Sequence, residues 1–456
     1  MENEGWAGNE FREVELGDKR RTRRLIRLAE QRSENPNGSI AASCGEKSDT
    51  KAAYRFLDNE AVGAEAILEA HYQATADRAT NEAIVLAVQD TTKLNYSSHH
   101  ATQGLGYLNG LQFRGMYVHC TLLVTPQRVP LGLIDQQVWV RPVEKYQVEH
   151  DRRKQLPTEV KESQKWIVSL EATARVQQRL GQTRIINIGD SEGDIFDLFR
   201  KAEQLQQEVI VRAANDRLVD HEERLLRAYL LRQPVAGELT VQVPRNKGQP
   251  ARTAHLEVRF APVSVRPPAQ RKKENLPSVH LWAVLAKEAN APEKVEAIHW
   301  LLLTTVVVGS FDQACVCIAW YTCRWVIETF HKVLKSGCRV EERQFGDAEN
   351  IQRYLALDSV VAWRVLYLTM MGRDQPDLPC TVILEAHEWQ ALYCFLYHTN
   401  QPPQKTPSLG EATRWVARLG GFLGRKSDGS PGPMSIWRGL QRLSDIANAW
   451  LVFHVS

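Results

Sequence analysis

The chain has 456 residues, of which 43% are hydrophobic and 24% are charged. These proportions are those of folded globular proteins, and they exclude the disordered, collagen-like and low-complexity classes. Lys and Arg number 57 against 54 Asp and Glu, so the net charge alone gives no argument for a nucleic-acid partner. At about 150 residues per domain, the length predicts about three domains, or one large domain with insertions.

The most apolar stretches are short. Residues 84–88 and 300–308 fall well below the ~20 residues that cross a bilayer, and no apolar segment opens the chain. We therefore expect neither a membrane protein nor a secreted one. The eight cysteines are scattered, which predicts reduced thiols. Four of them lie near His331, but their spacing is not that of paired zinc knuckles, so buried helix cysteines are the favoured interpretation.

The N-terminal 65 residues contain one strongly basic block. Residues 17–27 hold six Lys or Arg side chains and a single acid, Asp18, and a thin apolar stripe through Leu25 and Leu28 predicts a helix. A solvated cationic helix would show the same composition, but the density of positive charge favours contact with phosphates. A turn at 35–38 and a second helical pattern at 51–57 complete a small helical head, which we expect to bind DNA.

The pattern changes to buried strands after residue 83. The run 84–88 ends in Gln89 and Asp90, residues 116–124 and 131–140 form a predicted antiparallel hairpin, and the strand 185–188 ends shortly before Asp190. Helical patterns cover 160–180, stopped by Gly181, and 195–206. The alternation of strands and helices indicates an α/β core.

Between about 215 and 300 the sequence resembles a β insertion, with predicted strands at 239–243, 255–260 and 280–286. A buried strand at 300–308 follows. Ser310 and Gln313 then form a predicted capping box for a helix that runs to about residue 336. After about residue 375 a Trp-rich helical tail is expected as a separate unit.

The helix predicted at 311–336 has one polar face. At about 100° per residue, this face gathers one acid and several cationic or potentially cationic side chains, with apolar residues opposite. A surface helix with i, i+4 ion pairs would show this pattern, and so would a groove for a polyanion. We take the second interpretation, which makes these side chains candidate DNA contacts: Tyr321, Arg324, His331, Lys332 and Lys335, with Glu328 among them.

Two further carboxylates favour that interpretation. Asp90 and Asp190 each follow a strongly apolar strand, where a buried charge is costly unless a cation compensates it. Together with Glu328 they suggest a shared cation site. Carboxylate oxygens are the ligands that Mg²⁺ prefers, and two such ions can support in-line attack on phosphate. The three acids therefore predict phosphodiester chemistry.

These residues also carry a family resemblance. Tyr321, Arg324, Glu328 and Lys335 reproduce the Y-x2-R-x3-E-x6-K signature of the bacterial DDE transposases of the insertion-sequence IS-four group, and YTCRWVIETFHK (321–332) resembles the cut-and-paste Tn5 transposase. Other blocks that match the group span nearly the whole chain: GDKRRT (17–22), AYRF (53–56), QDTT (89–92), GDSEGDI (189–195), WLLLT (300–304) and ARLGGF (417–422).

The resemblance implies an RNase H-like catalytic core, a mixed five-stranded sheet with helices, at 66–372, with the β insertion at about 215–300. It further implies a helical domain at 1–65 that binds transposon ends and a helical dimerisation domain at 373–456. By the same resemblance, Asp90, Asp190 and Glu328 would hold two Mg²⁺ ions, for which Mn²⁺ can substitute. Trp300 would stack on a flipped base. Other matching positions are the basic residues Arg21, Arg24 and Arg212, and Asp194 near the active site.

The function that follows is a DNA transposase. It would cut the ends of a mobile element, through a hairpin by analogy with the family, and join the 3′ ends to target DNA. We expect a homodimer bridging two double-stranded DNA ends, in the bacterial cytoplasm at the nucleoid. Two alternatives stay open: a catalytically silent, DNA-binding relic that inhibits transposition, and a structure-directed nuclease with the same core.

Overall fold

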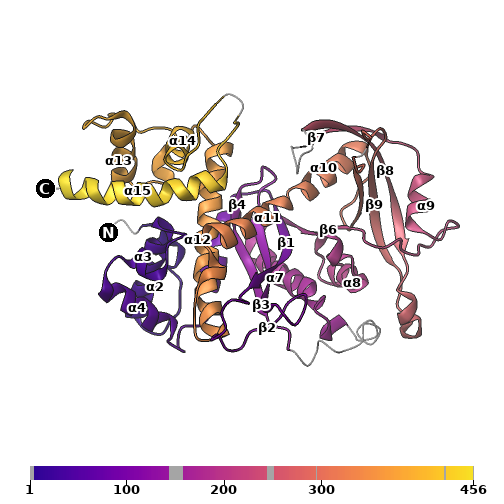
Figure 1. Ribbon diagram of the computed structural model, residues 1–456. Coiled ribbons are helices and arrows are strands. Elements are labelled where there is room, and N and C mark those ends of the chain that lie inside the picture. Colours follow the sequence, from indigo (N-terminus) through magenta and orange to yellow (C-terminus); the bar gives the residue numbers. More distant parts are fainter. Residues whose placement is uncertain (1–4, 143–157, 244–250, 294, 426–427, 455–456) are drawn as a thin grey trace. The chain divides into compact units, whose positions relative to one another are not determined.

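The computed structural model describes residues 5–142, 158–243, 251–293, 295–425 and 428–454 (Figure 1). The chain divides into two compact units. The first unit contains Met1–Ala79, Thr91–Gln147 and Val326–Ser456, and the second contains Thr80–Asp90 and Val148–Trp325. Each unit is described by itself below. The expected division into three consecutive domains, at 1–65, 66–372 and 373–456, stays a prediction.

The second unit is built on a mixed sheet. Its strands follow the order β1-β5-β6-β10-β9-β8-β7, with β1, β5 and β6 parallel and the rest antiparallel. Helices α7, α8 and α9 accompany it. The strands are β1 (Ile84–Asn95), β5 (Arg184–Gly189), β6 (Glu208–Arg212), β7 (Gly237–Val243), β8 (Arg252–Val265), β9 (Val279–Glu288) and β10 (His299–Thr304), and the helices are α7 (Gln164–Leu180), α8 (Phe196–Gln204) and α9 (Leu226–Leu231).

The expected insertion is not a separate layer. Strand β10 pairs with β6 on one side and with β9 on the other, so β7, β8 and β9 extend the core sheet beyond the five strands expected. Figure 1 shows β8 and β9 as long strands, with α9 next to β8. Strand β6 was not expected, because its apolar run, residues 209–211, is too short to stand out in the sequence.

Strand β10 also ends earlier than the sequence suggested. The apolar run continues to Val308, but the strand stops at Thr304, whose hydroxyl donates to the Val209 carbonyl at 2.7 Å and accepts from the Val306 amide at 3.0 Å. These side-chain bonds turn the backbone away from the ladder. The predicted cap of the next helix, α10 (Phe311–Thr322), is present in altered form: the Gln313 amide donates to Ser310 Oγ, but the Gln313 side chain accepts from Gly309.

The first unit is mostly helical. Its hairpin β3–β4 is antiparallel, and helix α12 is in contact with β4, α2, α4, α5, α14 and α15. Figure 1 shows α12 in orange beside the indigo N-terminal helices. The elements are α1 (Trp6–Glu10), α2 (Lys19–Glu34), α3 (Ile40–Cys44), α4 (Lys47–Leu57), α5 (Ala64–Ala79), β2 (Gly106–Tyr107), β3 (Arg114–Val124), β4 (Pro130–Trp139), α12 (Ala348–Asp374), α13 (Ala386–Tyr397), α14 (Leu409–Leu419) and α15 (Pro433–His454).

Helix α12 is long and apolar enough to cross a membrane by length and composition. However, 78% of its most apolar window is buried inside the protein. A helix that is apolar on all sides is typical of the core of a large unit. Its tertiary contacts therefore identify α12 as the central core helix of the first unit.

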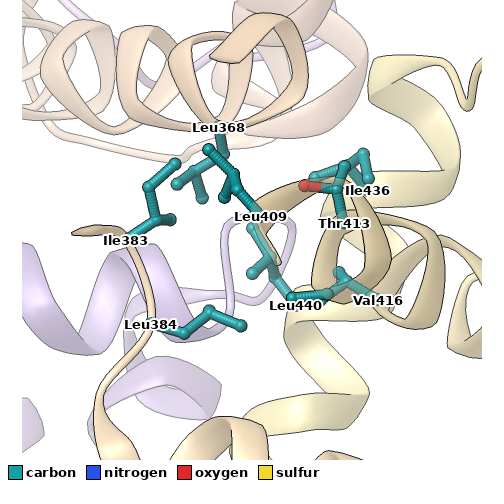
Figure 2. Close-up of a pocket in the computed structure, with 9 residues that line it drawn as sticks. Leu368, Ile383, Leu384, Leu409, Thr413, Val416, Ile436 and Leu440 are labelled. Carbon is teal, nitrogen blue, oxygen red and sulfur yellow. The ribbon is translucent and has the colours of Figure 1, made fainter. Parts of the chain in front are cut away.

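The helical tail forms its own apolar cluster. Trp389, Leu392, Trp415 and Ile436 are buried where α13, α14 and α15 pack together. A small cavity of about 20 Å³ lies where α14 and α15 meet α12. It is lined by aliphatic side chains and by the hydroxyl-bearing Thr413, as Figure 2 shows. The helical character expected of the Trp-rich tail is confirmed by these elements, whereas its being a separate unit stays a prediction.

Candidate active site

Asp90 and Asp190 lie at the same edge of the second unit's sheet. Strands β1 and β5 are parallel, and Val88 is paired with Ile188, so the two acids follow at equivalent positions. Neighbouring strands lie about 4.8 Å apart, so the two acids lie at the same level of adjacent strands, Asp90 within β1 and Asp190 just after the end of β5. Gln89 strengthens this end of the strand pair, because its Nε2 donates to Asn187 Oδ1 at 3.2 Å.

The turn that carries Asp190 is closely held. Asp190 caps a short 3₁₀ turn, Ser191–Gly193, by accepting from the Glu192 amide at 2.8 Å. Burial raises the pKa of the Asp190 carboxyl, while that hydrogen bond and the positive charges of Arg324 and Lys165 act in the opposite direction. A partly desolvated carboxylate of this kind favours a nearby cation.

An aromatic side chain that the sequence did not reveal packs under the same turn. Trp166 is 1% exposed, and a Cβ atom at Gly189 or Gly193 would lie 3.1 or 3.3 Å from its ring. A side chain at either position would force the ring or the turn to shift by a few tenths of an ångström. The neighbouring Lys165 is also new to the site: its Nζ lies 3.0 Å from Glu192 Oε2.

Several predicted DNA contacts gather near Asp190. Burial raises the pKa of the Tyr321 phenol, while the positive charges of Arg324 and Arg212 lower it and the negative charge of Asp190 raises it further. These four side chains therefore share one electrostatic neighbourhood. The ring of Trp300 lies 6.3 Å from that of Tyr321 and is half-buried. The structure thus brings together one carboxylate, two guanidinium groups, a phenol and an indole.

The helix predicted at 311–336 is interrupted. Helix α10 ends at Thr322, α11 (Trp325–Lys332) begins after a break at Cys323 and Arg324, and a π-helix, Val333–Gly337, follows. A single straight helical stripe from Tyr321 to Lys335 is therefore wrong, because the angle per residue changes at both junctions. The expected apolar face is confirmed, since Val326, Ile327, Phe330, Val333 and Leu334 are all buried.

His331 does not lie on the exposed polar face. Its side chain is 6% exposed, and burial together with the charge of Lys335 lowers its pKa to about 3. His331 is consequently neutral at pH 7 and gives no cationic charge. In contrast, Glu328 and Lys332 are exposed, and Lys335 Nζ donates to the Lys93 carbonyl at 2.9 Å and lies 3.4 Å from Glu341.

The three predicted metal ligands belong to different units. Asp90 and Asp190 are in the second unit and Glu328 is in the first. Across the described ranges, no group of three or more His, Cys, Asp or Glu side chains is arranged to hold a metal ion. The metal assignment therefore stays a prediction. All eight cysteines are free thiols; of the four near His331, Cys317, Cys323 and Cys338 are buried and Cys315 is partly exposed.

The basic block forms helix α2, as predicted, with Asp18 as its N-cap. The structure adds an acid that the sequence did not connect with this helix: Asp49 of α4 lies 3.2 Å from Arg24 and also pairs with Arg27. Arg21 donates to the Leu16 carbonyl at 2.8 Å. Part of the positive charge of α2 is therefore neutralised within the protein, while Lys19 and Arg23 are exposed.

Comparison with protein-family models gives two matches. Residues 3–62 match the model described as transposase DNA-binding, and residues 360–450 match the Tn5 transposase dimerisation domain. The first covers helices α1 to α4, and the second covers the end of α12 and helices α13 to α15. The two domains imply DNA and a second copy of this chain as partners. The chain is therefore a member of the Tn5-like transposases, a mixed α/β protein with an N-terminal helical DNA-binding domain and a C-terminal helical dimerisation domain.

Proposed function

We propose that this protein is an active DNA transposase. It binds the terminal inverted ends of a mobile element, cleaves them by metal-dependent phosphodiester hydrolysis and transesterification, and joins the 3′ ends to target DNA. The observation that carries the proposal is the pair Asp90 and Asp190 at one sheet edge, with Arg212, Tyr321 and Arg324 around Asp190. Carboxylates beside guanidinium groups suit a site for a phosphate and its cations.

The strand arrangement supports an RNase H-like core. In the first unit, β3 pairs with β4 in an antiparallel hairpin. Strand β1 then pairs in parallel with β5, and β5 with β6. Asp190 follows the carboxyl end of β5, the region where an open α/β sheet places its ligands, and Asp90 lies at the equivalent level within β1.

The residues present fit a divalent cation. Asp90 and Asp190 offer hard oxygen ligands, and burial of Asp190 makes its negative charge costly without compensation. Together with Glu328 they would hold two Mg²⁺ or Mn²⁺ ions, which when bound supply Lewis-acid stabilisation of the reacting phosphate oxygens.

The other side chains would bind and orient DNA. Arg212 and Arg324 would pair with phosphate oxygens near the scissile bond, and Lys332 and Lys335 would add positive charge. Trp300 would stack on an extruded base, and Arg21 and Arg24 of α2 would contact the transposon end. The buried, neutral His331 has no part in this proposal. Two protomers joined through their dimerisation domains would hold the two ends together.

The proposal is tested with Glu328→Gln. The purified chain is incubated with DNA that carries the inverted ends of its element, with and without Mg²⁺. The variant should bind the ends as the original chain does but lose cleavage by more than about 100-fold, because a metal ligand is removed while the phosphate contacts remain. Glu349→Gln, at an exposed glutamate of α12, is the control and should cleave normally.

Each other outcome has a defined meaning. Full cleavage by Glu328→Gln would reject the assignment of this acid. End binding without metal-dependent cutting by the original chain would favour an inhibitory relic. Cutting without preference for the end sequence would favour a structure-directed nuclease.

A further inference from the structure

We infer that Asp194 and Arg217 form a positioning pair, which fixes the turn that carries Asp190 against the segment that follows Arg212. The inference rests on the proposed function and deepens it, because it assigns a role to two residues that are not themselves metal or DNA ligands. Asp194 and Arg217 are therefore positioning residues rather than catalytic residues.

The contacts of Asp194 bridge two loops of the second unit. Its Oδ2 accepts from the amides of Ala214 at 2.9 Å and Asn215 at 3.1 Å. Its Oδ1 accepts from Arg217 Nε at 2.6 Å, and Arg217 Nη2 donates to the Asp194 carbonyl at 2.5 Å. One carboxylate thus binds the loop after β6 through two backbone amides and one guanidinium group.

The burial of this pair excludes a simple surface ion pair. The Asp194 side chain is 0% exposed and that of Arg217 is 9% exposed. A buried guanidinium group without its partner costs several kcal/mol, so the two side chains depend on each other. Arg217 is also satisfied inside the protein, whereas Arg212 is exposed and can face DNA.

The pair acts directly on the candidate site because of where its partners lie in the chain. Asp194 ends the turn that begins at Asp190, and Ala214 comes two residues after Arg212. Trp166 supports the turn from the other side, through its contacts with Gly189 and Gly193. Inside the turn, Glu192 donates to Asp190 Oδ1 at 2.8 Å, Gly193 donates to the Asp190 carbonyl at 3.1 Å and Asp194 donates to the Ser191 carbonyl at 3.4 Å. The Asp194 side chain adds the bonds that tie this turn to the loop after β6.

Positioning of this kind matters because a misplacement of about 1 Å in a reacting group can reduce the rate about 100-fold. If the pair is broken, Asp190 should remain present but be held less tightly. The expected result is weaker cation binding by a folded protein that still binds DNA ends through the DNA-binding residues of the first unit.

The test uses Asp194→Asn in the full chain. Asparagine keeps an acceptor for the Ala214 and Asn215 amides but turns an NH₂ group toward Arg217. Binding of Mn²⁺ is followed by electron paramagnetic resonance, without DNA or turnover. We expect the Mn²⁺ concentration for half-saturation to rise by about 10- to 100-fold, and hydrogen exchange of residues 189–195 and 212–217 to accelerate. Arg217→Gln should give the same pattern.

A matched control exists in the same unit. Glu288 is another buried carboxylate that binds an arginine, Arg252, and a backbone amide, that of Ile298 at 2.9 Å. Glu288→Gln should lower stability as Asp194→Asn does but leave Mn²⁺ binding unchanged. If Mn²⁺ binding weakens equally in both variants, the effect is general loss of stability and the inference is rejected.

A further test uses the unaltered chain, so its result does not depend on whether a variant folds. The Ala214 and Asn215 residues are exposed, yet their amides should exchange slowly because Asp194 accepts from both. Free exchange of both amides would overturn the inference. Failure of the proposed function can be told apart from failure of this inference. If the proposed function is wrong, the original chain neither binds Mn²⁺ nor cleaves DNA ends, but the two amides are still protected from exchange.

Discussion

Glu10 is a buried carboxylate that joins three elements of the first unit. Arg78 of α5 donates to both of its oxygens, at 2.7 and 3.0 Å, and His71 Nδ1 lies 2.5 Å from Oε1. The other ring nitrogen of His71 accepts from the Leu133 amide of β4 at 2.9 Å, which assigns the proton to Nδ1 and makes His71 a neutral donor. Burial lowers the pKa of His71, in agreement with this neutral form.

Stability should therefore depend on pH through Glu10. Burial by itself raises the pKa of Glu10, but His71 and Arg78 outweigh it and lower the pKa from 4.5 to about 2. A lowered pKa in the folded state contributes stability above pH 4.5 that is lost as the pH falls toward 2, by roughly 3 kcal/mol in all. Urea unfolding at several pH values measures this slope. Glu10→Gln should be less stable than the original chain at pH 7, and its free energy of unfolding should fall less between pH 5 and 3. A pH dependence equal to that of the original chain would contradict the assignment.

At this scale the sequence predicted some side chains and missed others. The position of Asp90 and Asp190 just beyond the apolar runs of β1 and β5 could be predicted, because such a run is a local pattern, although β1 continues past Asp90 to Asn95. The partners of Arg24 could not, because Asp49 is brought to it by the packing of α4 on α2. The burial of His331 depends on tertiary packing in the same way.

Helices α14 and α15 cross at a close contact between their backbones. A Cβ atom at Gly439 of α15 would lie 1.9 Å from the Val416 carbonyl oxygen of α14, and one at Gly420 would lie 1.8 Å from the Ser435 carbonyl oxygen. Real Cβ atoms do not approach backbone this closely, so both glycines are required where the helices meet. This crossing lies inside the residues that match the Tn5 dimerisation domain.

Gly439→Ala should consequently be destabilising, although alanine is about 1 kcal/mol better than glycine in an open helix. The added methyl group must push α14 and α15 apart, at an expected cost of about 1–3 kcal/mol. Thermal unfolding followed by circular dichroism shows whether the variant melts at a lower or a higher temperature than the original chain. Gly432→Ala, where a Cβ atom meets nothing within 4 Å, is the control. A rise in melting temperature for Gly439→Ala would show that the helices do not cross as described.

On the scale of the whole first unit, the DNA-binding domain is joined to the central helix by a buried ion pair. Arg32 of α2 lies 3.0 Å from Asp358 of α12, and both side chains are 0% exposed. Arg32 also donates to the carbonyls of Asn35 and Gly38, at 3.0 and 2.7 Å, and so fixes the turn after α2. The stability of the DNA-binding domain is therefore coupled to that of α12.

Asp358→Asn should lower the free energy of unfolding by about 3–5 kcal/mol, because the Arg32 charge is left buried without compensation. The double variant Arg32→Met with Asp358→Leu should recover only part of this loss, since the carbonyls that Arg32 binds lose their donor. Urea unfolding of the single and double variants measures the free-energy loss in Asp358→Asn and the part of it that the double variant recovers. Full recovery in the double variant would show that the ion pair, rather than the turn contacts, accounts for the role of Arg32.

The sequence by itself determined the local features of this protein. Periodicity indicated most helices and strands, Ser310 marked where α10 begins, and the signature around Tyr321 and Glu328 pointed to the transposase family that the two matched domains confirm. These features depend on residues close together in the chain, so they can be predicted from short stretches of sequence. The roles of Asp90, Asp190 and Glu328 stay predictions.

Only the tertiary structure decided which side chains are buried, paired or brought together. It extended the core sheet through β10 to β9, interrupted the helix at Cys323, buried His331 and linked Asp194 to Arg217. Each of these outcomes depends on the packing of the whole unit, in many cases on segments distant in sequence. Desolvation and strand pairing belong to the packed molecule, and no local pattern of residues encodes them.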